Sequence, residues 1–258
     1  MVIGMLEQAR PDPLPVQAPP RHALTAWLWP ALVPLAAAGL LLSLGAGWAA
    51  MVAGLALYAL TSVGLAYQRR RHAAPFGWAS QVTLARSGLV ALLAGALFEP
   101  ALYRELGWWL AGLALAALIL DGVDGWLARR LNESSDFGAR FDMEVDAALI
   151  LVLCVGLMAG GKAGAWVLAI GVMRYAFVGA ALAWPWLSAP LPPSFRRKLV
   201  CVWQVAALLI CLAPVVGPAL ATPILASALA LLAWSFWIDV AWLKRHAATN
   251  HHTLEDRK

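Results

Sequence analysis

The sequence predicts an all-α integral membrane protein that crosses the bilayer about eight times. Of its 258 residues, 62% are apolar and 13% are charged, which is about half the charged share of a soluble domain. The apolar residues form blocks of the length needed to span a bilayer. A secreted enzyme, a disordered regulator and a coiled coil are therefore excluded, and one helical bundle accounts for most of the chain.

Each predicted span is an apolar block with polar or aromatic residues near its ends. In chain order the blocks lie at 25–43, 48–67, 82–98, 107–130, 138–160, 164–186, 198–216 and 221–243. Pro30 and Pro34 interrupt the first block near its start. The second block ends at the basic run 69–71, and the seventh begins at the basic run 196–198. Tryptophans lie near block ends, as in an aromatic belt, at positions such as Trp27, Trp48, Trp108, Trp184 and Trp242.

Two polar segments flank the spans. Residues 1–23 contain five prolines together with Glu7 and Asp12, and we expect them to form a disordered cytoplasmic arm. The arm has no apolar region of the kind found in a signal peptide, so the first span is expected to remain uncleaved. Residues 246–258 are expected to form a cytoplasmic tail.

The basic residues between the spans indicate how the chain is oriented. Cytoplasmic loops of membrane proteins are enriched in Lys and Arg. If eight spans alternate, Arg104 and Lys162 lie on one side, and the other basic residues of loops and termini lie on the opposite side. We therefore expect a multi-pass protein of the cell (inner) membrane with both termini in the cytoplasm. The basic residues of these loops account for the net charge of +5, so we expect no nucleic-acid partner.

Acidic residues cluster at the junction of the fourth and fifth spans. Seven of the 14 acidic residues lie between positions 121 and 146. Ionisable groups at membrane depth are costly unless they are paired, hydrated or bound to a cation, so the cluster is a functional candidate. Helical spacing places one polar stripe on each helix. On the first helix, Asp121, Gly125 and Arg129 share a face, and Asp124 lies beside them. On the second helix, the stripe is Gly138, Asp142 and Asp146.

The turn between these stripes predicts how the carboxylates meet. Residues 132–136 are turn and N-cap formers, so the two helices should run antiparallel. Counted from the turn, Asp124 should face Asp142 and Asp121 should face Asp146. Such a group needs counter-charge, and oxygen-only ligands favour a hard divalent cation. We predict Mg²⁺, with Mn²⁺ as the alternative, and two ions as in phosphoryl-transfer sites.

Small and basic residues beside the carboxylates suit a phosphorylated ligand. Gly125 and Gly138 would let such a ligand approach the backbone, and Arg129 supplies a forked donor for phosphate.

These residues resemble the signature of the CDP-alcohol phosphotransferases, also called CDP-alcohol phosphatidyltransferases. The signature is D-x2-D-G-x2-A-R-x8-G-x3-D-x3-D, and this chain keeps all eight positions and every spacing. The resemblance implies a six-helix catalytic domain at 73–245, preceded by two additional N-terminal transmembrane helices at 24–72. It also implies a homodimer.

The resemblance also implies roles for individual residues. The metal ligands would be Asp121, Asp124, Asp142 and Asp146. Asp146 would also be the general base that deprotonates an acceptor hydroxyl, which attacks the β-phosphorus of a CDP-activated lipid and expels CMP. The CDP moiety would lie against Gly125, Ala128, Arg129, Ser135 and Gly138. The segment 80–86, which contains Thr83, is similar to a polar turn that contacts the nucleotide in relatives.

Signals for the acceptor are weaker. Relatives that use phosphorylated acceptors commonly carry Lys or Arg after the last aspartate, where this chain has Ala147. By contrast, RRKLVCVWQ resembles the Lys-x2-Thr-x2-Gln pattern of glycerophosphate-using members, with Cys201 in place of Thr. The candidate acceptor-binding residues are Arg174, Arg197, Lys198 and Gln204. Membrane anchoring is an equal alternative for the basic run at 196–198.

Other polar positions have structural interpretations. Arg140 and Glu144 are spaced for an ion pair on one helix, and Asp239 is expected to be an interfacial charge. The cysteines, which are expected to be small packing residues, lack the spacing of a zinc or redox motif: Cys154, Cys201 and Cys211.

The predicted function is transfer of a phosphatidyl group from CDP-diacylglycerol to a small alcohol or polyol, either free or phosphorylated, with release of CMP in phospholipid biosynthesis. Two alternatives remain open. A CDP-aminoalcohol phosphotransferase acting on diacylglycerol would carry the same motif. A multispan transporter or proton relay would use the acidic hairpin as an ion path, which predicts acidic residues spread over several spans.

Overall fold

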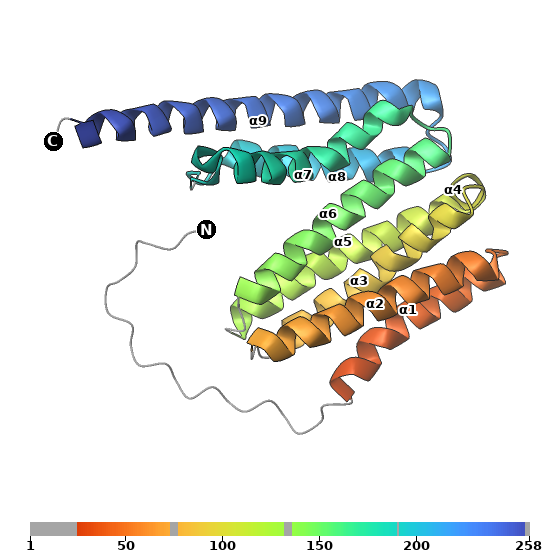
Figure 1. Cartoon of the computed structure of the whole chain (residues 1–258). Coiled ribbons are helices and arrows are strands. Elements are labelled where there is room, and N and C mark those ends of the chain that lie inside the picture. Colours follow the sequence, from red (N-terminus) through yellow and green to blue (C-terminus); the bar gives the residue numbers. More distant parts are fainter. Residues whose placement is uncertain (1–24, 73–76, 132–135, 190, 256–258) are drawn as a thin grey trace.

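The computed structural model describes residues 25–72, 77–131, 136–189 and 191–255, and these residues form helices without any strand. The predicted all-α class is confirmed. The α-helices of this part of the chain are α1 (Thr25–Ser43), α2 (Trp48–His72), α3 (Trp78–Gly95), α4 (Leu102–Glu105), α5 (Gly107–Arg130), α6 (Asp136–Ala159), α7 (Leu168–Ala183), α8 (Phe195–Leu212) and α9 (Pro218–Glu255), shown in Figure 1. The predicted arm at 1–23 lies outside the described residues.

Each of the eight predicted spans coincides with one long helix, and α4 is a short addition. Five segments of the described residues are long and apolar enough to cross a membrane: Trp48–Arg69, Trp78–Phe98, Gly107–Arg130, Ala165–Ala183 and Pro218–Arg245. The apolar part of α1, Trp27–Ser43, is shorter, and α6 and α8 both begin with charged residues. Large apolar side chains such as Leu182 and Trp237 are exposed, as a lipid-facing surface requires. The chain is a multi-pass membrane protein.

Two helices end in the same way, at a glycine with positive φ. Gly45 has a φ of 95° and follows α1, and Gly161 has a φ of 75° and follows α6. After α1, the N–H of Ala46 donates to the carbonyl of Leu41 over 2.9 Å, which satisfies a carbonyl that the helix end leaves open. Each glycine therefore reverses the chain into the next element.

Helix α3 is enclosed by protein rather than by lipid. Of its span, 83% is buried, against 28% or less in each of the other four candidate spans. It packs against α1, α2, α5 and α6. Glycines permit this close approach, since a Cβ atom at Gly54 would lie 2.9 Å from Cα of Leu92, and one at Gly88 would lie 2.7 Å from Cγ of Pro34. Polar side chains on α3 are therefore shielded from the bilayer.

A second group of helices, α7, α8 and α9, lies together in Figure 1, and α6 packs against α3 as well as against α7 and α8. Arg196 joins α8 to α9, because its Nη1 donates to the Ser235 carbonyl over 2.8 Å and its Nη2 lies 2.5 Å from Asp239 Oδ1. Asp239, which was expected to be an interfacial charge, is thus half of an ion pair between helices. Helix α9 continues to Glu255, so the segment predicted to be a tail is helical up to that residue.

Candidate active site

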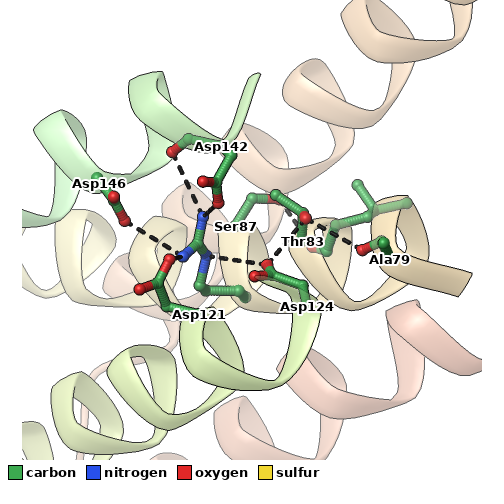
Figure 2. A network of polar contacts seen from close by, with 9 residues as sticks. Ala79, Thr83, Ser87, Asp121, Asp124, Asp142 and Asp146 are labelled. Carbon is green, nitrogen blue, oxygen red and sulfur yellow. Dashed lines mark hydrogen bonds and ion pairs between the residues drawn. The ribbon is translucent and has the colours of Figure 1, made fainter. Parts of the chain in front are cut away.

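The two acidic stripes meet at α3. Asp121 and Asp124 lie on α5, Asp142 and Asp146 lie on α6, and Figure 2 shows all four side chains directed toward one centre. Because α3 packs against both helices, its own polar residues reach the space between the stripes. The sequence predicted a site built from two helices, and the structure builds it from three.

Arg86 of α3 lies at this centre. Its Nη1 atom pairs with Asp121 Oδ1 and lies 3.2 Å from Asp146 Oδ1. Its Nη2 atom pairs with Asp142 Oδ1, and its Nε lies 3.8 Å from Asp124 Oδ2. The Arg86 side chain is only 1% exposed. One buried guanidinium therefore contacts all four carboxylates.

Asp124 differs from the other three aspartates. Its side chain is 5% exposed, and its Oδ2 accepts a hydrogen bond of 2.9 Å from the Thr83 hydroxyl (Figure 2). Thr83, which is expected to contact a nucleotide, is a buried residue that also orients this carboxylate. Asp124 therefore contacts α3 through both Thr83 and Arg86.

The remaining three carboxylates form a set that could hold a metal ion. Asp121, Asp142 and Asp146 each offer one oxygen, and these atoms lie within 4.8 Å of one another. Their side chains are 34%, 37% and 45% exposed, so an ion can reach them from the side away from Arg86. Three carboxylate oxygens suit a hard cation such as Mg²⁺ or Mn²⁺, and the residues present fit the predicted metal.

The residues expected to bind CDP lie along α5 and at the start of α6. Gly125 and Ala128 are half-buried and Arg129 is exposed, while Gly138 is half-buried on α6. A Cβ atom at Gly125 would lie 3.4 Å from Arg129 Nη1, so the arginine side chain extends beside the glycine as their spacing predicts. Ser135 lies outside the described residues.

The candidate acceptor residues lie on two helices, α7 and α8, and differ in their partners. Arg174 Nη2 pairs with Glu144 Oε1 at 2.9 Å, so Glu144 contacts α7 and not Arg140 as its spacing suggested. Arg197 Nη1 lies 3.6 Å from Asp239 Oδ1. Lys198 is exposed and Gln204 is 5% exposed, both on α8.

Cys201, on α8, differs from the other two cysteines in its exposure. Cys154 and Cys211 are buried, as expected of packing residues, but Cys201 is exposed. The expectation that all three cysteines pack inside the protein is wrong for this one.

Sequence reasoning missed Arg86. It lies in the segment 80–86 that resembles a nucleotide-contacting turn, but no role was predicted for it. The signal was present, since an arginine inside the apolar block 82–98 is as costly as the aspartates are. Gln81, in the same segment, contacts α1 instead, because its Oε1 accepts a hydrogen bond of 2.5 Å from Trp29 Nε1.

Comparison with known proteins places the site in a family. Residues 76–241 match the family model of the CDP-alcohol phosphatidyltransferases, and this range covers more than half of the chain. It begins just before α3, ends within α9 and contains Arg86 and the four aspartates. No solved structure matches the chain.

Proposed function

This chain belongs to the CDP-alcohol phosphatidyltransferase family, and we propose that it moves the phosphatidyl group of CDP-diacylglycerol to a small alcohol or polyol and releases CMP. The observation that carries the proposal is the convergence of Asp121, Asp124, Asp142 and Asp146 on one centre between α3, α5 and α6. The proposed reaction is a step of phospholipid biosynthesis at the cytoplasmic face of the membrane.

The carboxylates supply the proposed metal site. Asp121, Asp142 and Asp146 would hold one divalent ion, Mg²⁺ or Mn²⁺, and Asp124 would complete the ligand set for a second. The bound ions would neutralise pyrophosphate charge and stabilise the leaving group. Thr83 contributes by orienting Asp124 through the 2.9 Å hydrogen bond.

Asp146 is the proposed general base. It accepts the proton of the acceptor hydroxyl, whose oxygen then forms a bond to the β-phosphorus as the bond from that phosphorus to CMP breaks. The side chain is the most exposed of the four aspartates, at 45%, so a substrate hydroxyl can approach it. Arg86 Nη1, 3.2 Å from Asp146 Oδ1, orients the carboxylate.

The nucleotide and the acceptor would bind to residues of different helices around the aspartates. Gly125 and Ala128 leave room for the CDP moiety along α5, and the exposed Arg129 offers its guanidinium to phosphate. Helix α8 packs against both α5 and α6 and carries Lys198 and Gln204. Arg197 of α8 and Arg174 of α7 would add positive charge for a phosphorylated, glycerophosphate-like acceptor.

The function is tested by product identification. Purified protein is incubated with CDP-diacylglycerol, Mg²⁺ and a panel of free and phosphorylated alcohols, and the released CMP and the lipid product are identified by mass spectrometry. We expect Mg²⁺-dependent CMP release with one acceptor. CMP release from CDP-choline with diacylglycerol would support the aminoalcohol alternative instead. Solute transport without CMP release would support the transporter alternative.

The role of Asp146 is tested in the same assay. Asp146→Asn should lower turnover about 10²- to 10⁴-fold, the usual contribution of a general base, while CDP binding is largely kept. Glu105→Gln changes an exposed carboxylate on α4 and serves as the matched control, with turnover like that of the unchanged protein. Turnover retained by Asp146→Asn would contradict the assignment.

A further inference from the structure

Arg86 gives the carboxylate site a cation of its own. We propose that Arg86 is a positioning residue that holds the four aspartates together before a divalent ion binds and limits how tightly the site then retains that ion. The inference rests on the proposed metal site, and it concerns the contacts of Arg86 with all four aspartates rather than with Asp146 alone. The geometry is the contact of a single guanidinium with Asp121, Asp124, Asp142 and Asp146.

Charge explains why such a residue is needed. Oxygens of three aspartates lie within 4.8 Å of one another, and like charges this close repel one another. A positive charge among them offsets this repulsion. Four carboxylates and one guanidinium still leave a formal charge of −3, so the site continues to attract divalent cations.

Burial explains why Arg86 stays in place. Its side chain is 1% exposed, whereas Asp121, Asp142 and Asp146 are 34–45% exposed. The carboxylates therefore lie between Arg86 and the accessible side of the site. An ion arrives from that side, while Arg86 remains behind the carboxylates on the enclosed helix α3. It then competes with the ion for the Oδ1 atoms that it already contacts.

The shape of the side chain also matters. The two Nη atoms of Arg86 contact different carboxylates, with Nη1 between Asp121 and Asp146 and Nη2 at Asp142. A lysine carries the same charge on one nitrogen and cannot bridge the two stripes in this way. Arg86→Lys therefore keeps the positive charge but loses the bridge between the two stripes. Arg86→Gln removes the charge and keeps a polar side chain.

The test measures metal binding and stability without substrate. Mn²⁺ affinity is determined by electron paramagnetic resonance, and thermal unfolding is followed in EDTA and in Mn²⁺. Removing a positive charge from among the ligands should raise the Mn²⁺ affinity of Arg86→Gln at least about tenfold. Its unfolding temperature in EDTA should fall and recover in Mn²⁺. Arg104→Gln, an exposed arginine on α4, is the control and should change neither quantity.

The expected rise in Mn²⁺ affinity and fall in unfolding temperature in EDTA distinguish a positioning role of Arg86 from simple packing. A residue that only fills space would lower stability and Mn²⁺ affinity together, so an unchanged or weaker Mn²⁺ affinity of Arg86→Gln would overturn the proposal. If that variant cannot be purified folded, Arg86→Lys decides: an unfolding temperature in EDTA that falls and recovers in Mn²⁺ supports the proposal, and an unchanged one refutes it. Absence of Mn²⁺ binding to the unchanged protein would instead refute the proposed metal site.

Discussion

At the residue scale, the three cysteines differ in exposure. Cys201 is exposed on α8, whereas Cys154 and Cys211 are buried. The position corresponds to the Thr of the glycerophosphate pattern in the sequence. A thiol at this place gives chemical access to the side of the site where the acceptor is proposed to bind.

We expect that a bulky maleimide reacts with Cys201 in preference to the two buried cysteines and blocks transfer. Because α8 carries proposed acceptor residues, the adduct would misplace the acceptor, and CMP release should fall at least about tenfold. Labelling is measured by mass spectrometry and activity by CMP release. Cys201→Ser should keep its own activity when treated with the reagent. Full activity of completely labelled protein would show that the thiol lies away from the substrate path.

At the scale of elements, α1 and α2 support the helix that carries Arg86. Trp29 Nε1 of α1 donates to Gln81 Oε1 of α3 over 2.5 Å, and Pro34 packs against Gly88 about two turns further along α3. Glu99 Oε2 accepts a hydrogen bond of 2.8 Å from the Gly47 N–H, which ties the turn after α1 to the end of α3. The N-terminal pair thus contacts α3 near both of its ends.

Gly88→Leu should disturb both stability and turnover. A Cβ atom there would lie 2.7 Å from the rigid ring of Pro34, so α1 and α3 must move apart, and overpacking of this kind costs about 1–3 kcal/mol. Because α3 positions Arg86 and Thr83, CMP release should fall as well. Gly39→Leu on α1 is the control, since a Cβ atom at Gly39 meets nothing within 4 Å. Equal unfolding temperatures of the two variants would argue against tight packing of α1 on α3.

At the scale of the whole molecule, eight long helices that alternate in direction place basic residues at one side of the bundle. The end of α9, the end of α5 and the start of α6 lie at the same side of the bundle, at the left in Figure 1. The basic residues at the end of α5 and at the end of α9 therefore share a side with the aspartate site, as the charge distribution in the sequence predicts.

Reporter fusions in a bacterial inner membrane test this orientation. A fluorescent protein after Lys258 should be fluorescent and alkaline phosphatase at the same place inactive, because the C-terminus is proposed to be cytoplasmic. Alkaline phosphatase fused after Gly161, between α6 and α7, should be active. Activity of the phosphatase at the C-terminus would reverse the proposed orientation and with it the proposed side of the active site.

Local patterns in the sequence determined most of the fold and half of the site. Apolar blocks predicted each long helix, because a bilayer requires backbone groups to be satisfied within the segment. The four-residue spacing of Asp121, Gly125 and Arg129 predicted that they share a face of α5, because helical geometry alone determines which residues share a face. The assignment of Cys201 to packing failed because apolar neighbours in sequence do not reveal which face of a helix is covered.

Contacts between distant segments required the tertiary structure. Arg86 precedes Asp121 by 35 positions, and no spacing rule relates them. Only the packing of α3 against α5 and α6 brings this cation to the carboxylates and turns Thr83 toward Asp124. The sequence by itself determined a multi-helix membrane protein with a carboxylate stripe on each of two helices. The fold decided what neutralises those stripes, because the charge that does so is borne by a third helix held between them.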